Sequence, residues 1–356
     1  MKETVVAIIG AGRIAENAHL PALSQIENIR VKYLCDFFTE KAIALKNKFP
    51  IVEQVVSSVD TVLDDNEVDA VFIFAPNRLH YELGMKALKK GKHLFCEKPI
   101  ANTYKQALEM ADEAKKQNKI VNIGVGNRFN GVVETLEKFV KEGRFGNIYH
   151  VYCSFREFRS IPGLGGAFTN KKESGGGVLI DWGVHFFDII LYVLGGAKLK
   201  TITCDCYSEM AKDMKEYRYK NMWAENSSNI NNGVNDVDDF VTGYIRTDKA
   251  SISFNGAWAQ NIDKNDMYID FLGDKAGARL TYGGNFTFTD GKTLTTITPE
   301  CEKKNHFLEE DKAFINSIQT NIKCKNHIDE ILETAKLLEG LYLSSELKRE
   351  IKQEEI

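Results

Sequence analysis

The chain has 356 residues, of which 43% are hydrophobic and 27% are charged, and its formal net charge is −4. This length exceeds what one ordinary hydrophobic core organises, so we expect two domains. The small negative charge gives no reason to expect nucleic acid or an anionic membrane as a partner, and no apolar run has the ~18–20 residues of a membrane span.

The first apolar run and the cysteines indicate a cytoplasmic protein. Residues 5–9 are apolar and are followed at once by glycine, which predicts a first strand and not a signal peptide. The seven cysteines are scattered along the chain. Cys204 and Cys206 alternate as in a strand and lack the spacing of a metal knuckle. We therefore expect reduced thiols, no metal site and a cytoplasmic location.

A glycine motif follows the first predicted strand, residues 4–9. Residues 10–15 fit G-x-G-x-x-G/A, in which Gly10 allows a tight turn and Gly12 lets the backbone approach a pyrophosphate. Ala15 takes the third small position, where the next helix packs close to the sheet. The N-terminus of that helix offers N–H groups and partial positive charge to phosphates. Glycines in an ordinary turn give the same local pattern, so the neighbouring elements must decide between a dinucleotide-binding loop and an ordinary turn.

The second predicted strand, residues 30–35, ends in Asp36. An acidic residue about 20 positions past the last small residue is where the adenosine ribose hydroxyls are held. Phe37 and Phe38 offer no cation for a 2′-phosphate, which favours NAD over NADP. The alternative is that Asp36 is the N-cap of a helix over residues 39–48.

Further strands and helices alternate through the first 124 residues. Strands are predicted over residues 55–57, 68–74, 92–96 and 120–124, with helices over residues 59–65, up to residue 90, and over 104–117. This alternation predicts a right-handed parallel sheet of repeated βαβ units. Ligands bind at the carboxyl ends of such strands, where Asn77, His80, Glu97 and Lys98 are expected. The alternatives are a helix start at Asn77, a packing role for His80, and a solvated Glu97–Lys98 pair closing a strand.

From about residue 149 the pattern changes to long alternating strands. They are predicted over residues 149–156, 199–206, 240–246, 250–258, 266–272 and 278–282, with a closing helix over 328–349. This pattern predicts a mainly antiparallel sheet. Such a sheet needs cover on both faces and few helices are predicted here, so we expect one face to meet another subunit in a homodimer or homotetramer.

A glycine-rich segment, residues 175–185, precedes an apolar helix in this half. Its Asp181 and His185 are four residues apart and therefore neighbours on one helix face. The alternative is that Asp181 caps the helix and His185 only belongs to its first turn. A full capping box would need Glu or Gln at position 184, which is Val184.

Together these motifs resemble the Gfo/Idh/MocA family, named for glucose–fructose oxidoreductase, inositol dehydrogenase and a rhizopine-catabolism protein. The resemblance rests on residues 10–15, on residues 75–80, on Gly-Lys-His and Glu-Lys-Pro within 91–99, and on residues 175–185. It implies an α/β fold with an N-terminal Rossmann domain that binds NAD over residues 1–125. It also implies an α+β domain with a large, mainly antiparallel sheet over residues 126–356 for substrate binding and oligomerisation.

The resemblance also implies a set of site residues. The catalytic residues would be Lys98, Asp181 and His185, and the cofactor would be bound by Gly10, Gly12, Arg13, Ile14, Ala15, Asp36, Pro76, Asn77, His80, Glu97, Lys98 and Arg128. Arg128 lies in a segment that resembles the family's entry into the second domain. With Lys98 arriving from the other domain, the three catalytic groups would form an acid/base constellation.

The expected reaction is oxidation of a secondary CH–OH of a sugar, sugar acid or cyclitol, with hydride passing to C4 of the nicotinamide. His185 would take the hydroxyl proton, Lys98 would stabilise the developing negative charge, and Asp181 would orient His185 or bind a neighbouring hydroxyl. Two alternatives stay open. One is an enzyme that retains NAD and uses transient oxidation for elimination or epimerisation, and the other is a non-catalytic dinucleotide-sensing regulator.

Two features of the second half do not define the substrate. Four side chains of the second half have two interpretations: Arg156, Arg159, Trp182 and Trp258. In one they line a pocket, where arginine would suit a substrate carboxylate. In the other they are surface charges and core aromatics. Residues 207–235 break the strand pattern but carry Tyr217, Tyr219 and Trp223. We hypothesise that this segment folds near the substrate pocket or a subunit interface, and a mobile insertion without a role is the alternative.

Overall fold

The computed structural model describes residues 3–220 and 230–356, which form two compact units. Unit 1 comprises Met1–Asn130 and Lys304–Leu332, and unit 2 comprises Gly131–Lys303 and Glu333–Ile356. The sequence predicts a second domain over residues 126–356, whereas Lys304–Leu332 belongs to unit 1. The chain therefore returns to its first unit before it ends in the second.

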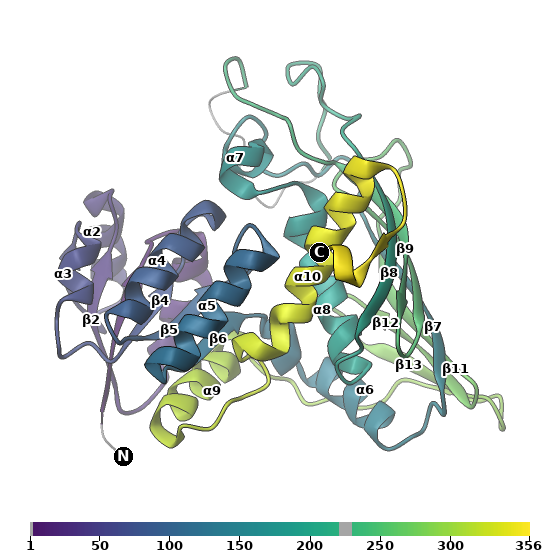
Figure 1. Ribbon diagram of the computed structural model, residues 1–356, viewed down its shortest axis with the longest axis horizontal. Coiled ribbons are helices and arrows are strands. Elements are labelled where there is room, and N and C mark those ends of the chain that lie inside the picture. Colours follow the sequence, from purple (N-terminus) through teal and green to yellow (C-terminus); the bar gives the residue numbers. More distant parts are fainter. Residues whose placement is uncertain (1–2, 221–229) are drawn as a thin grey trace. The chain divides into compact units, whose positions relative to one another are not determined.

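Unit 1 is built on a six-stranded parallel sheet with the order β3-β2-β1-β4-β5-β6 (Figure 1). Its strands are β1 (Thr4–Ile9), β2 (Ile29–Cys35), β3 (Val52–Val56), β4 (Ala70–Ile73), β5 (His93–Glu97) and β6 (Val121–Gly124). The strand order reverses between β1 and β4, so this is the point where a doubly wound sheet binds its ligand. The expectation of a Rossmann-type sheet is confirmed.

The helical elements of unit 1 follow the strands as the alternation predicts. They are η1 (Ala15–His19), α1 (Leu20–Leu23), α2 (Thr39–Lys48), α3 (Val59–Leu63), α4 (Asn77–Lys89), α5 (Tyr104–Gln117), η2 (Gly126–Phe129) and α9 (His306–Thr320). Ile8, Phe72 and Phe95 of the sheet share one buried cluster with Leu20 of α1 and Phe314 of α9. Helix α9, which the sequence analysis did not predict, thus forms part of the core of this unit.

Unit 2 is built on a nine-stranded sheet with the order β14-β13-β12-β11-β7-β10-β9-β8-β15. The strands are β7 (Ile148–Arg156), β8 (Leu199–Tyr207), β9 (Phe240–Thr247), β10 (Ser251–Ala257), β11 (Asp266–Gly273), β12 (Ala276–Thr281), β13 (Phe286–Asp290), β14 (Thr296–Ile297) and β15 (Ile351–Lys352). Only β7 and β10 pair in parallel, so the expectation of a mainly antiparallel sheet is confirmed.

Helices cover one face of this sheet. The helical elements are α6 (Gly131–Lys141), η3 (Ala167–Thr169), α7 (Lys171–Ser174), η4 (Leu179–Gly183), α8 (Val184–Val193), α10 (Ile328–Leu347), which belongs to unit 2 from Glu333 on, and η5 (Gln353–Glu355). Leu136 of α6, Phe187 of α8 and Leu341 of α10 pack with Val151 and Ile252 of the sheet. The other face carries exposed aromatic side chains, among them Tyr152.

One stretch of the described residues, Lys171–Val193, is long and apolar enough for a membrane span, and 78% of its apolar window is buried inside the protein. Helix α7 ends at Ser174 and the next helical segment is separated from it by three glycines.

Within 207–235, Tyr217 is buried and meets Tyr219 edge-on at 4.9 Å between ring centroids. This part of the segment is packed into unit 2, while Trp223 lies outside the described residues.

Candidate functional site

The glycine motif has the geometry that its spacing predicts. Gly10 has a φ of +109°, and a Cβ there would lie only 2.5 Å from the carbonyl oxygen of Phe74. Apart from Gly12 itself and its two chain neighbours, no described residue has an atom within 4 Å of the position that a Cβ would take on Gly12. Arg13 and Ile14 begin the helical segment and Ala15 is fully buried. The loop is therefore tight at its first glycine and open at its second, as a diphosphate requires.

Asp36 joins this loop to the end of β2. Its Oδ2 accepts the N–H of Ala11 at 2.7 Å, and its Oδ1 accepts the N–H of Phe38 at 2.8 Å. Helix α2 begins at Thr39 with Phe38 at the N-cap position, so the interpretation of Asp36 as the N-cap is wrong. An ionised carboxylate has about four lone-pair positions, so acceptor capacity for ribose hydroxyls remains.

His80 connects the loops that follow β4 and β5. Pro76 occupies the N-cap of α4 and Asn77 is its first residue. One turn later, His80 Nδ1 lies 2.7 Å from the Pro99 carbonyl oxygen and Nε2 lies 2.8 Å from that of Ala75. Burial lowers the pKa of His80, and a neutral ring has one N–H to donate. These contacts agree with the packing role, and a direct contact of His80 with the cofactor stays a prediction.

Glu97 ends β5 and is buried. Its Oε2 accepts the N–H of Lys98 at 3.1 Å, and its Oε1 lies 3.1 Å from Nε2 of His19. A Cβ on Gly124 of the adjacent strand would collide with this carboxylate. The interpretation of Glu97 and Lys98 as a solvated pair is therefore wrong. Lys98 itself is half-buried at the carboxyl end of the strand and is joined to Pro99 by a cis peptide bond.

His19 is the centre of a buried charged cluster that the sequence analysis missed. Its Nδ1 lies 2.9 Å from Asp311 Oδ1. Burial lowers the pKa of His19, but the carboxylates of Asp311 and Glu97 reverse this effect and raise the pKa to about 10. Glu310 is fully buried beside the ring, and burial raises its pKa well above the ordinary value. Ligand-type atoms of His19, Glu97 and Glu310 all lie within 4.8 Å of one another.

Arg128 was predicted from the resemblance as a cofactor residue. Its side chain is buried, and its guanidinium donates to the carbonyl oxygens of Lys325 at 2.7 Å and Glu330 at 3.2 Å. These contacts join η2 to the segment after α9 within unit 1. Arg128 thus stabilises the unit, and its contact with a cofactor stays a prediction.

Asp181 and His185 lie on one helical stretch of unit 2. The stretch begins with Val178 as the N-cap of η4, a π-helical turn that contains Asp181, and continues into α8. The alternative that Asp181 caps the helix is therefore wrong. Such single π turns are frequent at functional sites. His185 is half-buried, with its ring 6.5 Å from that of Tyr282.

A second buried carboxylate, Asp238, holds the glycine-rich segment before this helix. It accepts the N–H groups of Gly177 at 2.8 Å and Leu179 at 2.9 Å and the hydroxyl of Tyr342 at 2.9 Å. A Cβ on Gly177 would collide with the carbonyl oxygen of Asp238, and one on Gly176 with the Tyr342 hydroxyl. These glycines serve close packing, and this packing sets where the following Asp181 turn begins.

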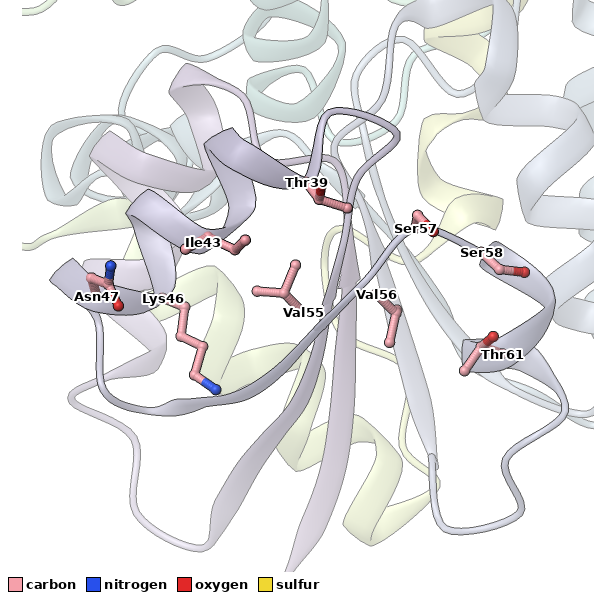
Figure 2. A pocket seen from close by; sticks show the side chains of 9 residues that line it. All are labelled: Thr39, Ile43, Lys46, Asn47, Val55, Val56, Ser57, Ser58 and Thr61. Carbon is pink, nitrogen blue, oxygen red and sulfur yellow. The ribbon is translucent and has the colours of Figure 1, made fainter.

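A cavity of about 700 Å³ opens on unit 1 at the edge of its sheet (Figure 2). It is lined by Thr39, Ile43, Lys46, Asn47, Val55, Val56, Ser57, Ser58 and Thr61. Figure 2 shows hydroxyl side chains from α2, the end of β3 and α3 around it. None of the predicted catalytic residues lines this cavity, so we do not assign the reaction to it.

The two halves of the chain match two family models. Residues 4–125 match the oxidoreductase family with an NAD-binding Rossmann fold, GFO/IDH/MocA, and residues 133–279 match the GFO/IDH/MocA C-terminal domain. The chain belongs to the Gfo/Idh/MocA family. Residues 4–125 match its NAD-binding domain, and the protein is an oxidoreductase.

Individual members of the Gfo/Idh/MocA family extend this comparison. D-glucoside 3-dehydrogenase of Escherichia coli (strain K12) is 32% identical over 314 residues, which cover 88% of this chain and 87% of that protein. Myo-inositol 2-dehydrogenase of Thermotoga maritima is 27% identical over 53% of this chain and 54% of its own. The solved structure of levoglucosan dehydrogenase in complex with NADH and levoglucosan has a TM-score of 0.84 at 19% identity, covering 99% of each chain.

The fold of a Gfo/Idh/MocA protein explains which site residues the sequence analysis found and missed. Residues next to strand ends were found, since the glycine motif and the strand pattern mark them. His19, Glu310 and Asp311 were missed because their association joins α9 to η1 across 292 residues. A histidine four positions after Ala15, on a helix that must pack against the sheet, was the one local signal for a buried charge.

Proposed function

We propose that the protein is an NAD-dependent dehydrogenase that oxidises a secondary CH–OH of a neutral polyhydroxylated ring, such as a glycoside or cyclitol. The observation that carries this proposal is the position of Lys98, directly after β5 in an NAD-binding sheet. The similarity to D-glucoside 3-dehydrogenase over most of both chains supports the substrate class.

Bound NAD supplies the hydride acceptor. The residues that would hold it fit, because Gly12 faces open space and Asp36 keeps acceptor capacity at the end of β2. The carboxylate of Asp36 also repels a 2′-phosphate, and the adjacent Phe37 is 84% exposed and adds no charge. NAD is therefore the proposed cofactor in preference to NADP.

Three side chains carry the proposed chemistry. His185 takes the proton of the substrate hydroxyl, since histidine exchanges protons near neutral pH. Lys98 donates to the same oxygen and stabilises the negative charge that develops on it. Asp181, four residues before His185 on the same helical stretch, orients the histidine or accepts from a neighbouring hydroxyl.

The two arginines suggested for a substrate carboxylate have other partners. Arg156 Nη2 donates to Asp266 Oδ2 at 2.8 Å. Arg159 donates to the side-chain oxygen of Asn261 and lies over the ring of Tyr217. Arg156 is already paired with a carboxylate, and Arg159 is engaged by an amide oxygen and an aromatic ring, so neither guanidinium is set up for a substrate carboxylate. We therefore propose a neutral sugar or cyclitol and not a sugar acid.

The exposed face of the nine-stranded sheet supports a homodimer or homotetramer. His150 on this face packs edge-on against Tyr152, with 4.5 Å between ring centroids, and stacks near Tyr244. Tyr152 is 48% exposed although it lies in the middle of the sheet. Exposed aromatic side chains grouped on one face are typical of subunit interfaces.

We predict that light scattering at micromolar protein concentration gives two or four times the mass of the 40.2 kDa chain. The buried area between subunits should exceed ~1,200 Å². A monomer at that concentration would contradict the proposed interface. All seven cysteines are free in the structure, which supports the proposed cytoplasmic location.

The experiment that tests the proposed function is an absorbance assay for NADH with three groups of compounds. Neutral glycosides and inositols should give NADH, whereas the matching sugar acids should give at least tenfold less. Equal rates with the acids would contradict the neutral pocket. Product formation without free NADH would favour the alternative in which the enzyme retains NAD.

A further inference from the structure

The last residue of β5 fixes the peptide that carries Lys98. Glu97 accepts the N–H of Lys98 through Oε2 and contacts His19 through Oε1, each at 3.1 Å. Gly124 on β6 makes room for this carboxylate, because a Cβ on Gly124 would collide with Glu97 Oε1. The Lys98 backbone is thus connected to a residue on η1 that is 78 positions away from Glu97.

His19 contacts a carboxylate with each ring nitrogen. Nε2 faces Glu97, and Nδ1 lies 2.9 Å and 3.2 Å from the two oxygens of Asp311. Ionised carboxylates only accept hydrogen bonds, so both ring nitrogens must carry a proton for both contacts to form. With both carboxylates ionised, this geometry requires an imidazolium ion.

The surroundings of the ring exclude water and hold its orientation. His19 has no exposed surface and stacks on Phe74, with 4.3 Å between centroids and 19° between planes. Phe95 and Phe307 meet it edge-on at 5.3 Å and 5.5 Å. A buried cation between two carboxylates interacts much more strongly than the same charges in water.

The other titratable groups that face His19 lie on α9. Burial raises the pKa of Glu310, which favours its neutral form, and burial also raises the pKa of Asp311, against the opposing effect of His19. Burial lowers the pKa of His306, which keeps this second histidine neutral. Asp311 and Glu97 differ from Glu310 in geometry: each contacts a ring nitrogen of His19, whereas neither carboxyl oxygen of Glu310 has a hydrogen-bond partner among the described residues. We therefore assign the charge of the cluster to His19, Asp311 and Glu97.

A metal ion is the competing occupant, because His19, Glu97 and Glu310 are ligand types gathered within 4.8 Å. A histidine ligand must present a nitrogen without a proton. The Nε2 of His19 instead lies 3.1 Å from Glu97 Oε1, and its Nδ1 lies 2.9 Å from Asp311 Oδ1, so each ring nitrogen already faces an acceptor. The contacts thus favour the imidazolium over a metal site.

We infer that His19 is a positioning residue for Lys98: as a buried imidazolium between Asp311 and Glu97, it holds the carboxylate that accepts the Lys98 amide. This inference rests on the proposed function, in which Lys98 stabilises charge on the substrate oxygen. Displacement of a catalytic group by about 1 Å can lower turnover about 100-fold, so a fixed peptide before Lys98 is of direct use to the reaction.

The test compares His19→Gln with a matched control, His93→Gln. Glutamine at 19 can still donate one hydrogen bond but carries no charge. His93 is the first residue of β5, the strand that ends with Glu97, and its ring accepts the N–H of Ile120 at 3.0 Å. We expect His19→Gln to lower kcat about 10- to 100-fold with the KM for NAD within twofold of wild type. The control should keep its kcat within a factor of about two.

The charge is measured separately in wild-type protein labelled with ¹⁵N-histidine, with His19→Gln to assign the signal. We expect both nitrogens of His19 to give imidazolium signals at pH 8. Any of three results would overturn the inference. They are a neutral His19 at pH 8, a divalent metal that is present at one equivalent and lost in the variant, and an unchanged kcat in a folded His19→Gln. If wild type reduces no NAD with any sugar, the proposed function fails, and the ¹⁵N signals decide the charge of His19 independently.

Discussion

Glu97 in unit 1 and Asp238 in unit 2 perform similar structural work with different partners. Each is a buried carboxylate that accepts backbone N–H groups next to a predicted catalytic residue. Glu97 contacts the His19 imidazolium, whereas the donors to Asp238 described above are neutral, namely backbone N–H groups and the Tyr342 hydroxyl. Burial accordingly raises the pKa of Asp238. The loop after β5 is held by an ion pair, whereas the glycine-rich segment before Asp181 is held by several neutral hydrogen bonds. This difference can be tested.

The largest expected effect is on stability, from Asp238→Ala. The N–H groups of Gly177 and Leu179 and the hydroxyl of Tyr342 would each lose an acceptor inside the core. At about 1–3 kcal/mol for each of the three unsatisfied groups, the free energy of unfolding should fall by about 3–9 kcal/mol. Urea unfolding measures this loss, and Tyr342→Phe, which removes one of the three donors, should cost about 1 kcal/mol. A loss below 1 kcal/mol for Asp238→Ala would show that these donors find other partners.

Lys98→Met should lower kcat about 100- to 1,000-fold while NAD affinity stays within a few-fold of wild type. The substitution removes the cation that stabilises the substrate oxygen and keeps the side-chain length. Steady-state kinetics and a fluorescence titration with NADH separate the two effects. Turnover close to that of wild type would end the proposed role of Lys98 and would leave the Glu97 cluster without a catalytic purpose.

The sequence predicts the elements around Glu97 and around Asp238 to different degrees. The strand over residues 4–9 and the helix over 39–48 have the bounds that the sequence predicts, since their apolar patterns are local. Helix α9 was not predicted, and three consecutive acidic residues, Glu309, Glu310 and Asp311, are more typical of an exposed surface than of a core. Only the pairing of Asp311 with His19, 292 residues away, explains why such a run lies in a core.

The contacts of Asp238 are a second feature that the sequence does not predict. The glycines before Asp181 are visible in the sequence, but their cause is the close approach of Asp238 and Tyr342 from distant parts of unit 2. No local pattern encodes a contact over 104 residues. The sequence predicts which side chains have catalytic chemistry, and the packing of distant segments decides what holds them.

Stability should respond to pH through His19. Its pKa is 6.5 when unperturbed and about 10 in the fold, so folding binds a proton between these values. The stabilisation is complete below pH 6.5 and is lost as the pH rises toward 10. We expect wild type to lose about 2 kcal/mol between pH 7 and 9 relative to His19→Gln, measured by urea unfolding. Parallel pH curves for the two proteins would contradict a charged His19.

The smallest expected effect is on cofactor choice. Asp36→Ser combined with Phe37→Arg removes a ribose acceptor and adds a partner for the 2′-phosphate, so the preference should move toward NADP about tenfold. The ratio of kcat/KM for the two cofactors measures this shift, with Phe38→Arg in place of Phe37→Arg as a positional control. A native protein that already prefers NADP would contradict the assignment of Asp36.

Transfer of deuterium from substrate to cofactor tests the proposed reaction most directly. The protein is incubated with NAD and a neutral methyl glucoside that carries deuterium on its ring carbons, and the released cofactor is analysed by mass spectrometry. We predict reduced cofactor with one deuterium at C4 of the nicotinamide, in an amount many times that of the enzyme. Turnover of the glucoside with no labelled cofactor beyond one equivalent per enzyme would contradict a dehydrogenase that releases NADH.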